Sequence, residues 1–511
     1  MIKIQNQNSK TLLSMATSLV AMAMTIIVNF FLSPYIVKTL GEEANGFTQL
    51  ANNFVNYAAL ITIALNSMAG RFITMHQCRG ENEKANTYYS SAIIANFFII
   101  LVLIVPAIFL VLKLEKIINI SAVNVLHVKV LFALVFLNFF LAQINSMFSI
   151  ATYVTNEQYI SNLINCIKTV LNALALLFVF ALFTPKIFYV SLVAVILSAI
   201  TVPLFLIVSR KILPDLRLSI KLFSIKAILQ LVSSGIWNVI TQCGALLMTG
   251  VDLLLANLYV GPTAMGVLSV SKTMPNCIAQ IGGSVNSSFS PNLTISYATA
   301  DKQGLLSSLR FAMKCSSILM CLPVMLLCVY GVAFYSLWQP TLNSNTLSLL
   351  SFLACLQFIP FAGPQVLYNV YTTTNKLKAN SLSVLITGVL NVLVVFILIK
   401  HTTLGLVAIA AVSSILAILK NVVLTVPYTA KILNLKWYVF YKDVLISCLC
   451  CAITGLICYV FQKIIIPASW IKLIISALLA GVISLVILVF VLFSKEERKR
   501  VLKKLKLIKD N

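Results

Sequence analysis

Long apolar runs alternate with short polar segments along almost the whole chain. The run at 92–112, AIIANFFIILVLIVPAIFLVL, exceeds the roughly 20 residues that cross a bilayer as a helix. Hydropathy predicts fourteen such helices, over 11–33, 47–70, 88–112, 130–153, 160–182, 187–208, 230–256, 266–290, 312–337, 346–371, 380–399, 402–424, 443–462 and 472–493. The pattern therefore predicts an all-α integral membrane protein.

The composition also indicates a membrane protein, and the placement of Lys and Arg predicts its orientation in the membrane. Of the 511 residues 60% are hydrophobic and only 10% are charged, too few to cover a soluble protein of this size. The net charge of +24 raises the possibility of a nucleic-acid partner. However, when both termini are assigned to the cytoplasm, most Lys and Arg fall on that side, as the positive-inside rule requires. We therefore expect no nucleic-acid partner, and contact with anionic membrane lipid at the basic tail.

The chain repeats itself at a spacing of about 220 residues. Segment 41–74 aligns with 261–294 without gaps at nine of 34 positions, and 155–172 aligns with 374–391 at seven of 18. The matches include Gly, Asn and an Asn-Ser pair, which shared hydrophobicity does not explain. An even number of helices per copy makes the copies parallel, as in transporters built of two rocking halves.

The repeat predicts two six-helix lobes followed by two extra helices. Each glycine repeat falls between the first two spans of its copy, where a tight turn is needed. The predicted domains are a first lobe over 1–210, a cytoplasmic linker over 211–229, a second lobe over 230–430, two further spans over 443–493 and a basic cytoplasmic tail over 494–511.

Polar residues share one face of several predicted spans. Because lipid-facing surfaces are apolar, such faces point inward, either to join helices or to line a hydrated path. Five stripes together favour a hydrated path. They comprise Ser14, Ser18, Thr25 and Asn29; Asn138, Asn145, Ser149 and Thr152; Ser161, Asn165, Lys168 and Asn172; Asn238, Gln242, Thr249 and Asp252; and Lys272, Asn276, Gly283 and Asn286.

Three ionisable groups fall well inside predicted spans, and each needs a partner or a task. Asp252 and Lys272 lie at similar depth on neighbouring spans, which predicts an ion pair, structural or functional. Lys168 lies about 12 Å from the cytoplasmic end of its helix, at 1.5 Å per residue. Arg71, at the inner end of the second span, is either a topological anchor or, with Lys168, an attractor for an anionic head group.

Several classes of function lack their motifs. The chain has no Gly-rich Lys-Ser/Thr loop for nucleotide hydrolysis and no acid, base and nucleophile constellation. Its 12 cysteines are scattered through the spans, and its three histidines have no ligand partners nearby. We therefore expect neither an enzyme nor a metal or cofactor site.

Three stretches resemble a known group of exporters. They are TLGEEANGFTQLANNF, ALNSMAGRFITMHQCRGENEKAN and VDLLLANLYVGPTAMGVLSVSK. They are similar to the multidrug/oligosaccharidyl-lipid/polysaccharide exporter superfamily, in its Wzx-like branch of O-antigen and capsule flippases. The likeness spans both lobes. It implies two lobes that form a V around a cationic cavity in the bacterial cytoplasmic membrane.

The resemblance also implies a substrate. An undecaprenyl-pyrophosphate-linked oligosaccharide would cross by alternating access, with polysaccharide polymerase and glycosyltransferases as partners in biosynthesis. Arg71, Lys168 and Lys272 suit the pyrophosphate, while amides and hydroxyls suit sugar. The substrate path would comprise Arg71, Lys168, Asn172, Asn145, Asn29, Asp252, Lys272, Asn276 and Asn286.

Other functions remain open at this stage. A cation-coupled multidrug exporter or a lipid II flippase would share the fold. Drug pumps commonly use embedded acids, whereas this chain has one acid against two lysines, which favours an anionic cargo. A major-facilitator carrier is disfavoured because its loop motif is absent from 71–87, and a non-transporting scaffold is disfavoured by the polar stripes.

Overall fold

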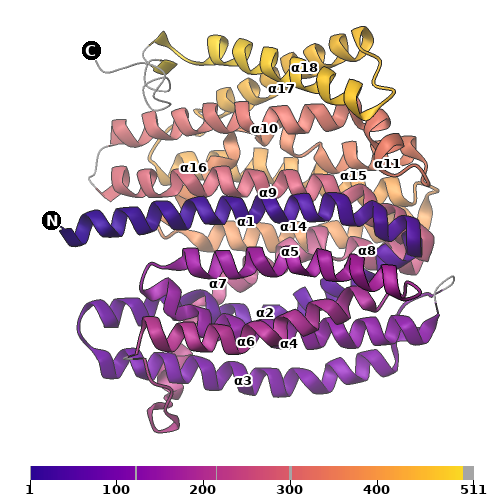
Figure 1. Ribbon diagram of the computed structural model, residues 1–511. Coiled ribbons are helices and arrows are strands. Elements are labelled where there is room, and N and C mark those ends of the chain that lie inside the picture. The colour runs from indigo at the N-terminus through magenta and orange to yellow at the C-terminus, as the bar shows by residue number, and fades with distance from the viewer. Residues whose placement is uncertain (1, 121–123, 215, 299–301, 496, 499–511) are drawn as a thin grey trace. The chain divides into compact units, whose positions relative to one another are not determined.

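The structure is a computed structural model that describes residues 2–120, 124–214, 216–298, 302–495 and 497–498. Every regular element in those ranges is helical, and Figure 1 shows long rods joined by short connections. The contacts divide the chain into two compact units, Met1–Val270 and Ser271–Asn511.

The first unit contains eight helices and the start of a ninth, among the residues described. They are α1 Ile2–Leu40, α2 Glu42–Cys78, α3 Asn82–Leu112, α4 Val125–Val154, α5 Gln158–Leu182, α6 Tyr189–Ile212, α7 Ile225–Thr249 and α8 Asp252–Tyr259, and α9 Pro262–Ala298 continues into the second unit. Within the unit α4 packs along α6, α2 along α3 and α7, and α1 along α5.

The second unit contains more interrupted helices. They are α10 Lys302–Trp338, α11 Ser344–Cys355, α12 Phe358–Phe361, α13 Tyr368–Thr373, α14 Leu377–His401, α15 Leu406–Lys420, α16 Val426–Ile432, α17 Tyr441–Ile464 and α18 Trp470–Leu492. A 3₁₀ turn, Pro364–Leu367, precedes α13, and a π-helical turn, Asn421–Thr425, joins α15 to α16.

Twelve helices of the described part are long and apolar enough to cross a membrane. Two of the fourteen expected spans differ. The span expected over 266–290 lies in α9, which is long but carries Lys272 among many Ser, Asn and Gly residues. The span expected over 346–371 is broken into α11, α12, a 3₁₀ turn and α13, because Pro360, Gly363 and Pro364 interrupt the helix.

The duplication is visible in the ends of the helices. Both α2 and α9 have 37 residues and begin 220 positions apart, and both α5 and α14 have 25 residues. The counterpart of α4 begins at Ser344 and ends at Thr373, so it also keeps its length. Asn124 caps α4 and Asn343 caps α11, each through its side chain.

The repeated glycines have two roles. Gly41 and Gly261, with φ of 85° and 124°, adopt backbone conformations that other residues rarely tolerate, as the predicted turns require. Gly46 and Gly266 instead lie where α2 and α9 cross within the first unit. A Cβ on Gly266 would meet the backbone of Glu42 at 2.5 Å. The glycines therefore allow the two equivalent helices to touch.

The contact boundary differs from the boundary of the repeat. The repeat assigns 230–430 to the second lobe, yet α7 and α8 pack with the first compact unit, chiefly α7 against α2. At this crossing a Cβ on Gly235 would lie 2.1 Å from the carbonyl oxygen of Ala64. The predicted lobes are defined by sequence and stay a prediction.

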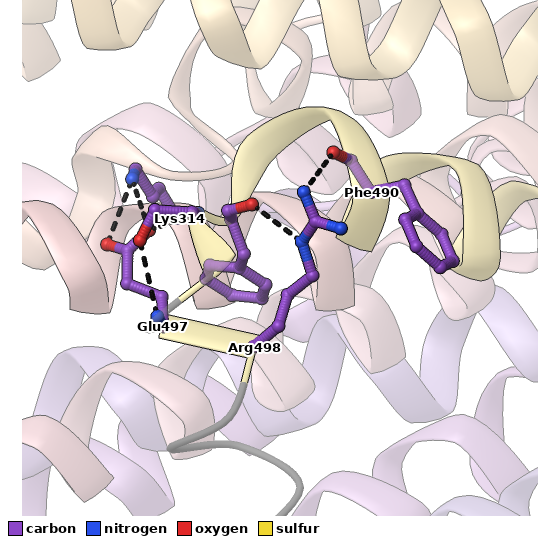
Figure 2. Close-up of polar contacts among 6 residues, drawn as sticks. Lys314, Phe490, Glu497 and Arg498 are labelled. Atoms are coloured by element: carbon purple, nitrogen blue, oxygen red, sulfur yellow. Dashed lines mark hydrogen bonds and ion pairs between the residues drawn. The ribbon is translucent and has the colours of Figure 1, made fainter.

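The last two helices pack on α10, beside which they run in Figure 1. Figure 2 shows how the end of α18 is held: Lys314 Nζ donates to both carboxylate oxygens of Glu497, at 3.0 and 2.9 Å. Arg498 donates to the carbonyl oxygens of Phe490 and Phe493, at 3.3 and 2.9 Å. The rest of the predicted basic tail, 499–511, and residue 496 lie outside the described residues.

Candidate functional site

A polar cavity of about 370 Å³ lies in the first unit, where the ends of α2 and α4 meet the start of α5. Under the predicted orientation this is the cytoplasmic end of the unit. Most of its lining residues carry an amide, hydroxyl or guanidinium group. They comprise Asn66, Ser67, Gly70, Arg71, Ser149, Ile150, Thr152, Tyr153, Gln158, Ser161 and Asn162.

Arg71 is the charged residue in this wall. Its side chain is exposed and makes no hydrogen bond or ion pair with any residue that the structure describes. Gly70 beside it makes room for an aromatic wall, since a Cβ there would lie 2.9 Å from Cδ1 of Tyr153. An unpaired guanidinium beside amides and hydroxyls can bind an anionic group and neighbouring hydroxyls at once.

A hydrogen-bonded network supports the cavity from inside the bundle. Asn66 accepts a hydrogen bond from Asn96 of α3 at 2.7 Å and donates to Gln143 of α4 at 3.4 Å. Gln143 in turn donates to Thr62 of α2 at 2.6 Å. These bonds tie α2, α3 and α4 together directly behind one wall of the cavity.

The start of α5 is held against α1. Lys10 forms an ion pair with Glu157 at 2.5 Å, and the backbone N–H of Tyr159 donates to Ser14 Oγ at 3.2 Å. Asn162, which also lines the cavity, donates to the carbonyl oxygen of Ser14 at 3.1 Å. The polar stripe at the start of α1 therefore serves partly to position the α5 wall.

Lys168 lies in a different cluster, among α4, α5 and α6. Its Nζ donates to Ser198 Oγ at 2.7 Å, and Ser198 donates to Asn138. Asn145, expected on a stripe facing the path, is buried and donates to Thr201 at 3.0 Å. Lys168 is not among the residues lining the cavity, so the structure does not bring it together with Arg71 there.

Nearby polar atoms in this cluster lack partners. The Oδ1 atoms of Asn145 and Asn172 are both buried and accept no hydrogen bond from the described residues. Unsatisfied buried acceptors are uncommon in native proteins, and each calls for a physical reason. Asn172 thus stays a candidate for the path, while the amide nitrogen of Asn145 already joins α4 to α6.

The other expected site residues are spread over both units. Asp252 is buried at the first residue of α8, and Asn29 is exposed on α1. On α9, Lys272 is half-buried and Asn276 is exposed, while Asn286 accepts two hydrogen bonds from Asn369, both at 2.9 Å. Because Asp252 and Lys272 belong to different units, their ion pair stays a prediction.

Two polar residues, Gln143 and Lys420, were not predicted from the sequence. Gln143 lies between two stripe positions but outside the stripe. Lys420 lies near the end of the span expected over 402–424, whereas the apolar helical segment continues to Ile432, about 18 Å beyond Lys420 at 1.5 Å per residue. The apolar run that follows Lys420 was the sequence signal that the span continues past it.

No three His, Cys, Asp or Glu side chains gather as metal ligands in the described residues.

Comparison with known proteins identifies the family of the chain. A family model described as "Polysaccharide biosynthesis protein" matches residues 12–291. The "Uncharacterized membrane protein EpsK" of Bacillus subtilis (strain 168) is 29% identical over 495 residues, which cover 97% of this chain and 98% of that protein. Sequence similarity therefore extends well beyond the family model.

Solved structures share the fold at low identity. "Lipid II flippase MurJ, inward closed conformation" gives a TM-score of 0.64 at 16% identity, covering 92% of this chain and 97% of that one. A "multidrug resistance MATE family transporter of the MOP superfamily" gives 0.61 at 15% identity, covering 82% and 98%. The chain is a multi-pass membrane protein with this transporter fold, and it belongs to the polysaccharide biosynthesis protein family.

Proposed function

We propose that this protein is a flippase for an undecaprenyl-pyrophosphate-linked oligosaccharide, which it moves from the cytoplasmic to the outer leaflet for surface polysaccharide synthesis. The observation that carries the proposal is the unpaired Arg71 in a cavity of amides and hydroxyls. A pyrophosphate-sugar head group cannot cross about 30 Å of hydrocarbon unaided, so it needs such a polar path.

The mechanism follows from the different solubilities of the two ends of the substrate, an apolar polyprenyl tail and a polar pyrophosphate-sugar head group. The polyprenyl tail stays in the bilayer, while Arg71 binds the pyrophosphate and Asn66, Gln158 and Asn162 bind sugar hydroxyls. A cavity of about 370 Å³ holds only part of a large oligosaccharide, so the remainder extends out of it. Alternating access of the two predicted lobes, 1–210 and 230–430, then carries the head group outward.

The proposal includes the location and the partners. The chain lies in a bacterial cytoplasmic membrane with both termini in the cytoplasm. Glycosyltransferases supply its lipid-linked substrate, and a polysaccharide polymerase consumes the product. Asp252, Lys272, Asn276, Asn286, Asn29, Asn172 and Lys168 are proposed to lie along the later path.

Deletion of the gene, followed by complementation with variants, tests this proposal. We expect deletion to abolish surface polysaccharide, and Arg71→Gln to restore about tenfold less than wild type, because a charge-assisted bond to phosphate is lost. Polysaccharide is measured by quantitative immunoblot against protein level in the membrane. The matched control is Arg79→Gln, since Arg79 is exposed just after α2 and does not line the cavity.

Three results would contradict the proposal or its assignment of Arg71. If deletion leaves polysaccharide intact but sensitises cells to cationic drugs, the protein is a multidrug exporter. If deletion instead halts cell-wall synthesis, lipid II is the cargo. Equal complementation by both Arg variants would remove Arg71 from the path.

A further inference from the structure

Lys420 is a nearly buried cation in the second unit. It is the last residue of α15 and is 9% exposed. Its Nζ donates to the hydroxyl of Tyr368 at 3.3 Å and lies 5.1 Å from the centre of the same ring. No carboxylate of the described residues pairs with it.

The hydrogen bonds around Lys420 leave donors unused. Tyr368 passes a hydrogen bond to Oδ1 of Asn421 at 2.6 Å, and Thr425 donates to the same oxygen at 2.9 Å. An ammonium has three N–H donors, of which the protein occupies one here. The side-chain nitrogen of Asn421 also donates to no described residue. Four N–H groups on adjacent residues therefore have no acceptor among the residues described.

The helix that carries Lys420 and Asn421 changes its hydrogen-bonding pattern at Asn421, and neighbouring helices bond to its backbone there. Asn421–Thr425 forms a π-helical turn, a rare form that is frequent at functional sites. Tyr441 donates to the carbonyl oxygen of Val422 at 2.8 Å, and Tyr371 donates to that of Thr425 at 3.3 Å. Hydroxyls from α17 and α13 thus hold the wide turn in place and position Lys420.

Packing alone gives no reason for a lysine here. A buried charge without a counter-charge destabilises a protein, and an apolar residue of similar volume is often at least as stable. An acceptor rich in oxygen would satisfy the surrounding unused donors. A phosphate group supplies both the negative charge and the oxygens.

A cavity of about 550 Å³ lies beside the π-helical turn. Val423 of that turn lines it, together with residues of α16 and the segment after it, including Tyr428, Lys431 and Trp437. A row of tyrosine rings joins it to Lys420: Tyr371 lies 5.9 Å from Tyr428 and 6.5 Å from Tyr368, centre to centre.

We propose that Lys420 and Asn421, with Tyr368 beside them, bind the phosphate group of a lipid. The site shares no residue with the Arg71 cavity, and its residues all belong to the second unit. Two lipids carry this chemistry: the polyprenyl pyrophosphate of the substrate and an anionic bilayer phospholipid. Only the first choice rests on the proposed function.

Thermal unfolding of the full-length protein in detergent micelles tests the site, because a ligand that binds the folded state raises its Tm. The probes are farnesyl pyrophosphate and dioctanoyl phosphatidylglycerol, with farnesol as the uncharged control. We expect at least one anionic probe, but not farnesol, to raise the Tm. Lys420→Met should need about tenfold more of that probe, the loss typical of a charge-assisted hydrogen bond.

Two variants control for charge and for folding. Lys431→Met removes a lysine from the neighbouring cavity and should bind the probe as wild type does. Ligand-free Lys420→Met should unfold at the wild-type temperature or above it, because it removes a buried charge. Tyr368→Phe keeps the ring but loses the hydroxyl, and should weaken probe binding less than Lys420→Met does.

The outcomes separate the two proposals. Response to farnesyl pyrophosphate alone identifies the substrate lipid, and response to phosphatidylglycerol alone identifies a bilayer lipid. Unchanged probe binding by Lys420→Met, or a marked fall in its ligand-free Tm, would overturn the site. If surface polysaccharide survives gene deletion while Lys420→Met still loses probe binding, the flippase proposal fails and the site stands.

Discussion

Asn156 and Asn375 occupy equivalent positions in the two copies and share an uncommon backbone conformation. Their φ angles are 58° and 56°, in the left-handed region. The residue after each one bonds back to the preceding helix: the N–H of Glu157 donates to Thr152 O at 2.7 Å, and that of Lys376 donates to Tyr371 O at 2.9 Å. Asn tolerates this conformation better than other residues with a Cβ, which explains why Asn recurs at this turn.

The Asn375 turn gives a test at this scale. Asn375→Ala should destabilise the protein by about 1 kcal/mol, because a left-handed conformation costs an alanine roughly 1–2 kcal/mol. Asn375→Gly should be near neutral, since glycine adopts the conformation freely. Thermal unfolding in micelles measures both. Equal losses for the two variants would show that the side chain, not the backbone angle, matters.

Among the helices, α2 and α9 show how closely two equivalent elements approach. Within the first unit Asn45 donates to Ser269 Oγ at 2.8 Å, and Gln49 donates to the carbonyl oxygen of Ser269 at 3.2 Å. These bonds lie next to Gly46 and Gly266, whose missing side chains let the backbones meet. Small residues at a crossing with polar bonds beside them are typical of membrane helix pairs.

The α2–α9 crossing predicts a contrast between two glycines of α9. Gly266→Ala should lower the yield of folded protein and its Tm, because the new Cβ would meet backbone atoms that cannot yield. Overpacking of this kind costs about 1–3 kcal/mol. Gly283→Ala meets no atom within 4 Å and should be neutral or slightly stabilising. Size-exclusion yield and thermal unfolding measure both, and a loss in Gly283→Ala matching that in Gly266→Ala would refute the contact explanation.

The end of α18 depends on a titratable group. Ser494 and Glu497 form a capping box, with bonds of 2.8 and 3.2 Å between each backbone N–H and the other side chain. Partial burial alone would raise the pKa of Glu497. The hydrogen bonds from Ser494 and Lys314 outweigh it, so the pKa is lowered. A lowered carboxylate pKa stabilises the docked segment above the unfolded value, about 4.3, and this is lost as pH falls through the folded value.

Acid should therefore release Ser494, Glu497 and Arg498 from α10. Hydrogen exchange of these residues in nanodiscs should stay slow at pH 7 and become faster than the intrinsic rate change predicts as pH falls below about 4.3. Glu497→Gln should exchange fast throughout, without that pH dependence. Lys442→Met is a control, since it leaves the bonds of Glu497 in place. A wild-type pH response in Glu497→Gln would assign the release to another group.

At the scale of the molecule, the sequence revealed the duplication because turn and crossing positions demand particular residues. Gly and Asn at such positions survive divergence, whereas apolar residues exchange freely. Hydropathy did not reveal the break in the 346–371 span, since Pro360 and Gly363 sit inside an otherwise apolar run. The order of the helices along the chain was thus more predictable than their continuity, and twelve of the fourteen expected spans correspond to long apolar helices in the described residues.

The candidate site was predictable only in part. Arg71 was identified because a cation at a span end is visible in the sequence, and it does line a cavity. Lys168 is equally visible, but its acceptor Ser198 comes from α6 and depends on how three helices rotate against one another. Lys420 was missed because the span was expected to end at 424, whereas the helical segment continues through a π-helical turn to Ile432. The rotation of helices against one another and the continuity of each helix depend on packing, which a single sequence does not show.

The unbroken α4 and its broken counterpart over 344–373 have equal length and equivalent ends. Divergence of the two copies has therefore changed the continuity of this helix but not the positions of its ends. A regular helix resists flexure along its full ladder of hydrogen bonds, whereas proline and glycine create sites where a kink needs no further bond to break. The two copies therefore share the same helix order, but the segment 344–373 of the second copy should bend more easily than α4 of the first.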